Sequence, residues 1–280
     1  MTSGKAIFLS LLMALVSMEA KGQSAPAVDD GMYLKQADSA LREGRLIQAG
    51  QMILWLEHHG DAATADDVAL LKAEYAIAHS DIATATAALA TIKDATRNVC
   101  RLDGARGWLA ANGNALDNAI VSLGNAVQNC PDDAGIWNLL GLVLIQKGEA
   151  AAAAEAFDNS LMLAPGEPDI LNNHAVALLQ KGEVERAGLQ LEDAARRAPE
   201  NRSIADNLDF VRGMQGMTPE RQPGNSDAEW GTRLVNVAKG AKAASRIPQA
   251  NALFSRALLT LDHFDNELWS EMTAPPEIHP

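Results

Sequence analysis

Residues 134–167 read AGIWNLLGLVLIQKGEAAAAAEAFDNSLMLAPGE, and this stretch decides the fold. Its large apolar residues recur at helical spacing, at Trp137, Leu140, Leu144 and Phe157. Gly148 separates the two halves, where a turn requires a positive φ that only glycine adopts at little cost. Pro165 follows the second half and cannot continue a helix. The stretch therefore predicts two antiparallel helices joined by a tight turn.

The same pattern recurs every 34 residues. Small residues and prolines occupy columns with this spacing: Gly107, Gly141 and Ala175; Ala119, Ala153 and Ala187; Ala126, Ser160 and Ala194; Gly148 and Gly182; Pro131, Pro165 and Pro199. A small residue on each helix lets the two backbones approach closely, and the large residues fill the gap to the next pair. Because one pair cannot bury its apolar face alone, we expect the pairs to stack.

The order Trp137-x2-Leu140-Gly141-x2-Leu144, followed by Ala153-x3-Phe157, resembles the tetratricopeptide repeat. Leu144 departs from that pattern, because Tyr is usual there. Further copies of the unit are expected at 30–63, 66–99, 100–133 and 168–201. The resemblance implies an all-α solenoid, a superhelix of helix-turn-helix hairpins whose first helices line a concave groove for a protein or an extended peptide.

The composition divides the chain into five expected segments. They are a signal peptide at 1–22, a repeat array with a capping helix at 30–215, a linker at 216–226, a degenerate hairpin at 227–265 and a tail at 266–280. The linker is rich in Gly, Pro and polar residues.

The N-terminus has the pattern of a secretory signal. Ala6–Val16 is an apolar stretch too short to span a bilayer, and Ala20-Lys21-Gly22 places small residues for cleavage before Gln23. An uncleaved amphipathic N-terminus is the alternative. No cysteine stands directly after the apolar stretch to carry a lipid, and no later segment of the sequence is long and apolar enough to span a membrane. We therefore expect a periplasmic or secreted protein.

The charge and the motifs argue against several function classes. The net charge of −13 disfavours nucleic acid and anionic membranes as partners. No nucleophile, phosphate-loop, dinucleotide or metal-protease motif occurs, so we expect no enzyme, no metal and no cofactor. The pair His58-His59 is expected to bond carbonyl groups at a helix end, and His174 is expected to be a packed or bridging residue.

The two cysteines, Cys100 and Cys130, are predicted at the start of a first helix and at the end of its partner. Those two ends are neighbours in an antiparallel hairpin, and an exported protein meets an oxidising compartment. The sequence allows two alternatives, a disulfide that closes this hairpin or two separate, partly buried thiols.

The resemblance also implies a set of groove residues. They are Arg101, Trp108, Asn112, Asn138, Leu142, Gln146, Asn172, Asn173, Val176, Gln180, Asn207 and Phe210. Asn side chains could hold a peptide backbone through paired donors and acceptors, or could only satisfy neighbouring helices. Lys is absent from the fifth position of each unit, where some relatives clamp a terminal carboxylate, so recognition of a free C-terminus is not expected.

Three functions are consistent with these features. The first is a scaffold for protein–protein interaction in a bacterial cell-envelope machine, because the overall layout is similar to the tetratricopeptide component of tight-adherence (Flp) pilus assembly. The second is a periplasmic chaperone or an adaptor in envelope maintenance. The third is a hydrolytic or metal enzyme that carries the repeats.

Overall fold

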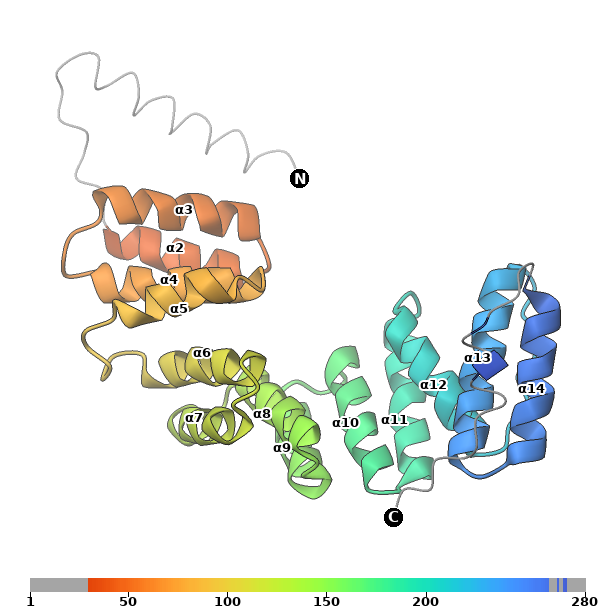
Figure 1. Ribbon diagram of the computed structural model, residues 1–280. Coiled ribbons are helices and arrows are strands. Elements are labelled where there is room, and N and C mark those ends of the chain that lie inside the picture. The colour runs from red at the N-terminus through yellow and green to blue at the C-terminus, as the bar shows by residue number, and fades with distance from the viewer. Residues whose placement is uncertain (1–29, 262–265, 267–268, 271–280) are drawn as a thin grey trace. The chain divides into compact units, whose positions relative to one another are not determined.

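The computed structural model describes residues 30–261, 266 and 269–270 (Figure 1). The predicted signal peptide and most of the predicted tail lie outside these residues. All regular structure in the described part is α-helical, which confirms the predicted fold class. The helices, in chain order, are α2 (Asp30–Arg42), α3 (Leu46–His59), α4 (Ala65–Ala78), α5 (Ile82–Ala90), α6 (Val99–Asn112), α7 (Leu116–Asn129), α8 (Ala134–Lys147), α9 (Ala150–Leu163), α10 (Pro168–Gln180), α11 (Val184–Arg197), α12 (Arg202–Met214), α13 (Asp227–Ala243) and α14 (Ile247–Thr260).

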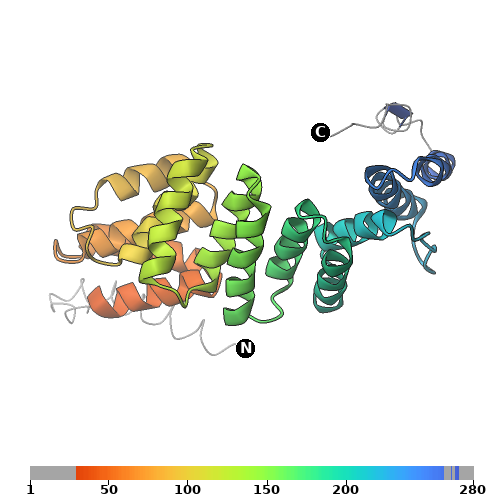
Figure 2. The same cartoon turned by 90° about the horizontal axis from the view of Figure 1, so that it is seen from below.

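The chain forms two compact units, Met1–Ala105 and Arg106–Pro280, and the division lies inside α6. In the first unit α2 packs against α3, α4 packs against α5, and α4 also contacts both α2 and α3. In the second unit each helix from α7 to α14 packs against the next one (Figures 1 and 2). The first helices α8, α10 and α12 also contact one another in turn, as expected for stacked hairpins.

Close packing inside a hairpin rests on the small-residue columns. Phe157 of α9 is fully buried, and a Cβ added to Gly141 of α8 would lie 2.6 Å from the Cε1 atom of its ring. Ala153 and Ala187 are also fully buried. The columns found in the sequence are therefore the positions at which the helices touch, and any larger residue there must displace a neighbour.

The ends of the helices follow local sequence signals. Gly148 ends α8 with φ of 84° in the left-handed region, as the turn predicted. The Asp133 side chain accepts a hydrogen bond from the Ile136 N–H and caps the start of α8 at 3.1 Å. Pro165 lies just beyond the end of α9, where it stops the helix as expected.

Helix α12 was expected to cap the array, but α13 packs along it. A Cβ on Gly213 would lie 1.9 Å from the carbonyl oxygen of Val237, and one on Gly240 would lie 1.8 Å from that of Phe210. The backbones of α12 and α13 thus meet directly through two glycines, a contact for which no other residue leaves room. Within the second unit, α12 therefore has packed neighbours on both sides.

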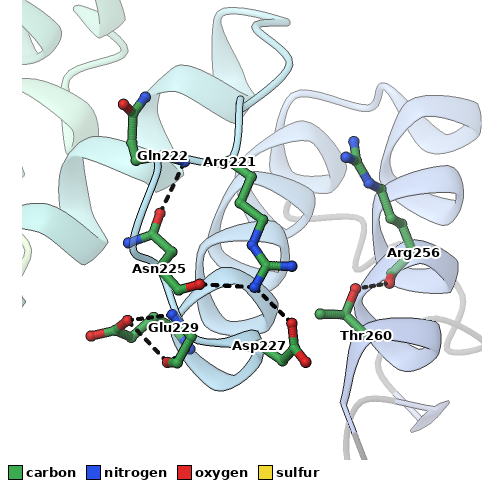
Figure 3. Close-up of polar contacts among 8 residues, drawn as sticks. Arg221, Gln222, Asn225, Asp227, Glu229, Arg256 and Thr260 are labelled. Atoms are coloured by element: carbon green, nitrogen blue, oxygen red, sulfur yellow. Dashed lines mark hydrogen bonds and ion pairs between the residues drawn. The ribbon is translucent and has the colours of Figure 1, made fainter.

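The segment expected to be a linker is tied to the helices around it (Figure 3). The Arg221 Nη2 group donates to the carbonyl oxygen of Asn225 at 2.8 Å and to Oδ1 of Asp227 at 2.7 Å. Ser226 and Glu229 form a reciprocal capping box at the start of α13. This loop is held by specific hydrogen bonds, in contrast with the behaviour of a flexible Gly/Ser tether.

Candidate functional site

A row of asparagine side chains crosses the first helices of the second unit. The Nδ2 group of Asn207 on α12 donates to Oδ1 of Asn172 on α10 at 2.8 Å. Asn172 in turn donates to the adjacent Asn173 at the limiting distance of 3.5 Å. The Nδ2 group of Asn173 donates to Oδ1 of Asn138 on α8 at 3.1 Å. We call these four residues the amide ladder.

The repeat explains why these side chains meet. Asn138 and Asn172 stand at the fifth position of successive units, and Asn173 and Asn207 stand at the sixth position. Each bond between helices joins a fifth position to the sixth position of the next unit, 35 residues further along the chain. One such bond therefore links α8 to α10 and one links α10 to α12, because stacking places equivalent turns of the first helices side by side.

All donors in the amide ladder point in the same direction along the solenoid, from α12 towards α8. The four side chains are half-buried. Each amide keeps at least one further N–H and at least one further lone pair that the ladder does not use. The sequence left open whether these asparagines bind a partner or satisfy neighbouring helices, and their principal hydrogen bonds are made with each other.

Apolar and glutamine side chains lie beside the ladder. Leu142 on α8 is 39% exposed, and Val176 and Phe210 hold the equivalent positions on α10 and α12 as half-buried residues. Gln146 and Gln180, one helical turn further on, are exposed. We call Leu142, Val176, Phe210, these two glutamines and the amide ladder the first-helix face.

The nine residues of the first-helix face are uncharged, whereas charged residues make up 21% of the chain. The fifth position of α12, beside this face, is Asp206, which accepts a hydrogen bond from Nδ2 of Asn236 at 2.8 Å. The apolar residues of the face are flanked by amide groups that both donate and accept hydrogen bonds. Such a surface is suited to the backbone and apolar side chains of another polypeptide. It offers no group that could act as a nucleophile or a general base at neutral pH.

Arg101, which the sequence assigned to the groove, belongs to the first unit and is held by two acidic residues. Its Nε atom donates to Oε1 of Glu74 at 2.8 Å, its Nη2 atom also bonds Glu74, and the same Nη2 atom lies 2.9 Å from Oδ1 of Asp38. Burial by itself lowers the pKa of the Arg101 guanidinium, but Glu74 and Asp38 outweigh it and raise that pKa. The charge of Arg101 is therefore compensated inside the chain.

Two other expected groove residues lie in the second unit on α6. Trp108 is half-buried, and the exposed Asn112 donates its Nδ2 group to the Trp108 carbonyl oxygen at 2.9 Å. This bond spans one helical turn, so the Asn112 amide covers the last turn of its own helix.

Four of the histidines contact backbone carbonyl groups or lie buried among other side chains. The Nδ1 atoms of His58, His59 and His79 lie 2.8 to 3.0 Å from the carbonyl oxygen four residues earlier, as expected for the first two. His174 is 1% exposed on α10, and neither ring nitrogen has a hydrogen-bond partner. Burial lowers its pKa, although Asp158 lies 3.6 Å from Nε2. No group of three or more metal-ligating residues occurs in the described part of the chain.

The sequence did not reveal an ion pair between α12 and α13. Asp209 is 3% exposed and accepts from Nε of Arg233 at 2.9 Å and from Nη2 at 3.2 Å. The hydrogen bonds to Asp209 are the main reason that the pKa of Arg233 is raised. The available signal for this ion pair was a carboxylate, Asp209, at a helical position that faces the core. Its partner Arg233 lies 24 residues away, beyond the predicted linker.

No sequence profile of a known family and no curated protein matches the chain. The pilF protein of Pseudomonas aeruginosa is a structural neighbour, with 17% identity, a TM-score of 0.51, and coverage of 86% of this chain and 95% of that one. TTC0263, a tetratricopeptide-repeat protein of Thermus thermophilus, has 17% identity, a TM-score of 0.50, and coverage of 65% of this chain and 98% of that one.

A third neighbour is found in a hetero-tetramer called APC/C Cut9–Hcn1. It has 14% identity and a TM-score of 0.53, and the match covers 95% of this chain but 45% of that one. At identities this low the likeness bears on the fold alone. The chain has the fold of stacked helical hairpins that tetratricopeptide-repeat proteins share.

Proposed function

We propose that this protein is an exported scaffold that binds a segment of a partner protein on its first-helix face. The observation that carries the proposal is the uncharged strip of Leu142, Val176 and Phe210 beside the amide ladder, in a chain with a net charge of −13. A continuous strip of amides and apolar side chains is suited to contact with another polypeptide.

The dimensions suit an extended peptide. Packed helices lie about 8–10 Å apart, so the three first helices span roughly 20 Å, which corresponds to about six residues of extended chain. Leu142, Val176 and Phe210 would contact peptide side chains about three residues apart, while the unused N–H groups and lone pairs of the amides would bond the peptide backbone. The Cut9–Hcn1 hetero-tetramer is an example of this fold in an assembly of different proteins.

The place of action in this proposal is the bacterial cell envelope. The support is the signal-like N-terminal sequence and the similarity of layout to the tetratricopeptide component of tight-adherence pilus assembly. None of the described helices has the length and hydropathy of a membrane span. A periplasmic chaperone or maintenance adaptor would use the same face for a range of unfolded clients.

Site-specific photocrosslinking in living cells tests the proposal. A benzophenone amino acid at Gln146 or Gln180 should yield a discrete adduct with one envelope protein. The same probe at Leu189, which is 67% exposed on the second helix α11, is the matched control and should not yield it. Equal adducts at all three positions, or none at Gln146 and Gln180, would refute the proposed face. Adducts with many different proteins at those two positions favour the chaperone.

Export is tested separately by N-terminal sequencing of the protein recovered from the periplasm or medium. The mature chain should begin at Gln23. Recovery of the intact chain from the cytoplasm alone would contradict export without affecting the first-helix face. A substrate-dependent activity, or stoichiometric zinc in the purified protein, would favour the enzyme hypothesis instead.

A further inference from the structure

The first unit contains a cleft that is independent of the first-helix face. Its volume is about 470 Å³, and it lies between the last turns of α3 and α5, with the start of α4 as its floor. Ligand sites in proteins commonly occupy 300–1,000 Å³, so the cleft is large enough for a bulky side chain. Its wall residues include Ala65, Ala69, Ala87 and Ala88.

The cleft exists because these wall side chains are short. Along α5 the sequence IATATAALA offers no large residue on the side facing the cleft, and Ala88 is already buried there. The space is therefore open to a side chain supplied from outside the unit.

Helix α5 also presents an exposed face made of small residues. Ala83, Ala87 and Ala90, spaced four and three residues apart, are exposed on one side of the helix. Ile82 beside them is 46% exposed, and α5 contains no charged residue. Small residues at this spacing allow a second helix to approach closely, as the glycines do between α12 and α13.

The charges around the cleft indicate which partner suits it. Glu57 and Asp61 bring two carboxylates to the rim, and Lys72 is paired with Glu57 at 2.5 Å. Two helix C-termini, those of α3 and α5, add partial negative charge. The N-terminus of α4 adds no net positive charge, because Asp66 and Asp67 stand in its first turn. The rim is therefore negative overall.

We propose that this cleft is a second docking site, which takes an amphipathic helix of a partner protein. A bulky apolar residue of that helix would enter the space over Ala69 and Ala88, and its backbone would lie along Ala83, Ala87 and Ala90. A lysine or arginine beside the apolar residue would lie against Glu57 and Asp61. The site does not depend on the first-helix face, so the two proposals can fail separately.

Fluorescence anisotropy of the full chain at 150 mM salt tests this site. The probe is a labelled 18-residue amphipathic helix of Leu, Ala and Lys, compared with the same peptide carrying Glu for Lys. We expect saturable binding of the Lys peptide and no binding of the Glu peptide. Ala87→Lys should weaken it at least tenfold, because it places a cation in the cleft.

Ala151→Lys is the matched control, since Ala151 is an exposed alanine on α9 and the variant has the same added charge. It should change the affinity less than twofold. Ala87→Trp, which fills the cleft without a charge, should also abolish binding while the circular dichroism spectrum is retained. Absence of binding to the wild type, or equal weakening by Ala87→Lys and Ala151→Lys, would overturn the proposal. A concentration-dependent dimer that Ala87→Trp dissociates would also overturn it, by identifying a second copy as the occupant.

Discussion

The side-chain amide of Asn173 on α10 donates a hydrogen bond to Oδ1 of Asn138 on α8 at 3.1 Å, and so joins two successive hairpins. The pair of Asn207 and Asn172 repeats this relationship between α12 and α10 at 2.8 Å. Residues that the repeat pattern assigns to partner binding thus also hold the array together. A partner that lies on these amides would bind a surface that the stacking itself has ordered.

Removing the middle of the amide ladder should lower both the stability of the array and its affinity for a partner. Asn172→Ala together with Asn173→Ala should lower the free energy of unfolding by about 1–3 kcal/mol, since each lost hydrogen bond contributes about 0.5–1.5 kcal/mol. Helix content at 20 °C should be unchanged, and partner binding should weaken. Urea denaturation followed by circular dichroism measures the first effect. Asn129→Ala, which removes an exposed bond within α7, is the control and should cost less than about 0.5 kcal/mol. Equal urea midpoints for the double variant and the control would contradict the ladder.

Overpacking should test the register of the hairpins. Gly141→Leu should destabilise the protein by about 1–3 kcal/mol, because even its Cβ atom would lie 2.6 Å from the Phe157 ring. Gly124→Leu on α7 is the comparison, since no atom lies within 4 Å of a Cβ added there. Differential scanning calorimetry should show a lower Tm for the first variant alone. If Gly141→Leu matched the wild type, the assigned helix contact would be wrong.

The ion pair between α12 and α13 should be costly to break. Asp209→Asn removes the carboxylate charge that pairs with the half-buried Arg233 guanidinium, for which we expect a loss of about 1.5–3 kcal/mol. Asp227→Asn breaks the exposed pair with Arg221 and should cost at most about 1 kcal/mol. Chemical denaturation of both variants measures the contrast. Similar small losses would show that Asp209 contributes little to the joint between α12 and α13.

His174 should make the stability depend on pH. Burial holds the pKa of its imidazole below the ordinary value of 6.5, so the unfolded chain binds more protons once the pH falls below about 6.5. Stability should therefore fall on acidification from pH 7.5 to 5.5. The charged groups that act on the ring are Asp158, Lys181, Glu183 and Arg186.

Replacing His174 with the residue of the preceding unit isolates its contribution. His174→Leu adopts the side chain of Leu140, which fills the same column. Thermal melts at the two pH values should show a smaller loss of Tm for this variant than for the wild type. An equal loss would assign the pH dependence to the carboxylates instead.

The choice between a disulfide of Cys100 with Cys130 and two separate thiols, which the sequence left open, can be tested chemically. Neither residue is a free thiol in the structure. A bond that closes a loop of about 30 residues contributes roughly 3–4 kcal/mol when only chain entropy is counted. Peptide mapping without reductant should recover the linked pair from exported protein, and reduction should lower the Tm. Two alkylated cysteines in the unreduced protein would contradict the prediction.

The sequence by itself determined the all-α class, the hairpin unit and the C-terminal ends of α7 to α11, where the glycine and proline columns lie. These features depend on short-range signals: apolar residues at helical spacing, Gly148 in a turn and Pro165 after a helix. The 34-residue period then implied stacking, because a single hairpin cannot bury its apolar face. The contact of Gly141 with Phe157 lies inside one hairpin and pairs a small-residue column of the first helix with a large residue of the second.

Only the tertiary structure decided which hydrogen-bond and ion-pair partners the polar side chains have. The bonds between helices in the amide ladder, the compensation of Arg101 by Glu74 and the pair of Asp209 with Arg233 join residues 24 to 35 positions apart on different helices. A hydrogen bond forms only if two such atoms come within about 3 Å, and a small change in how two helices cross moves them beyond that distance. The period places a residue on a face of its helix, whereas the packed arrangement of several helices selects its partner.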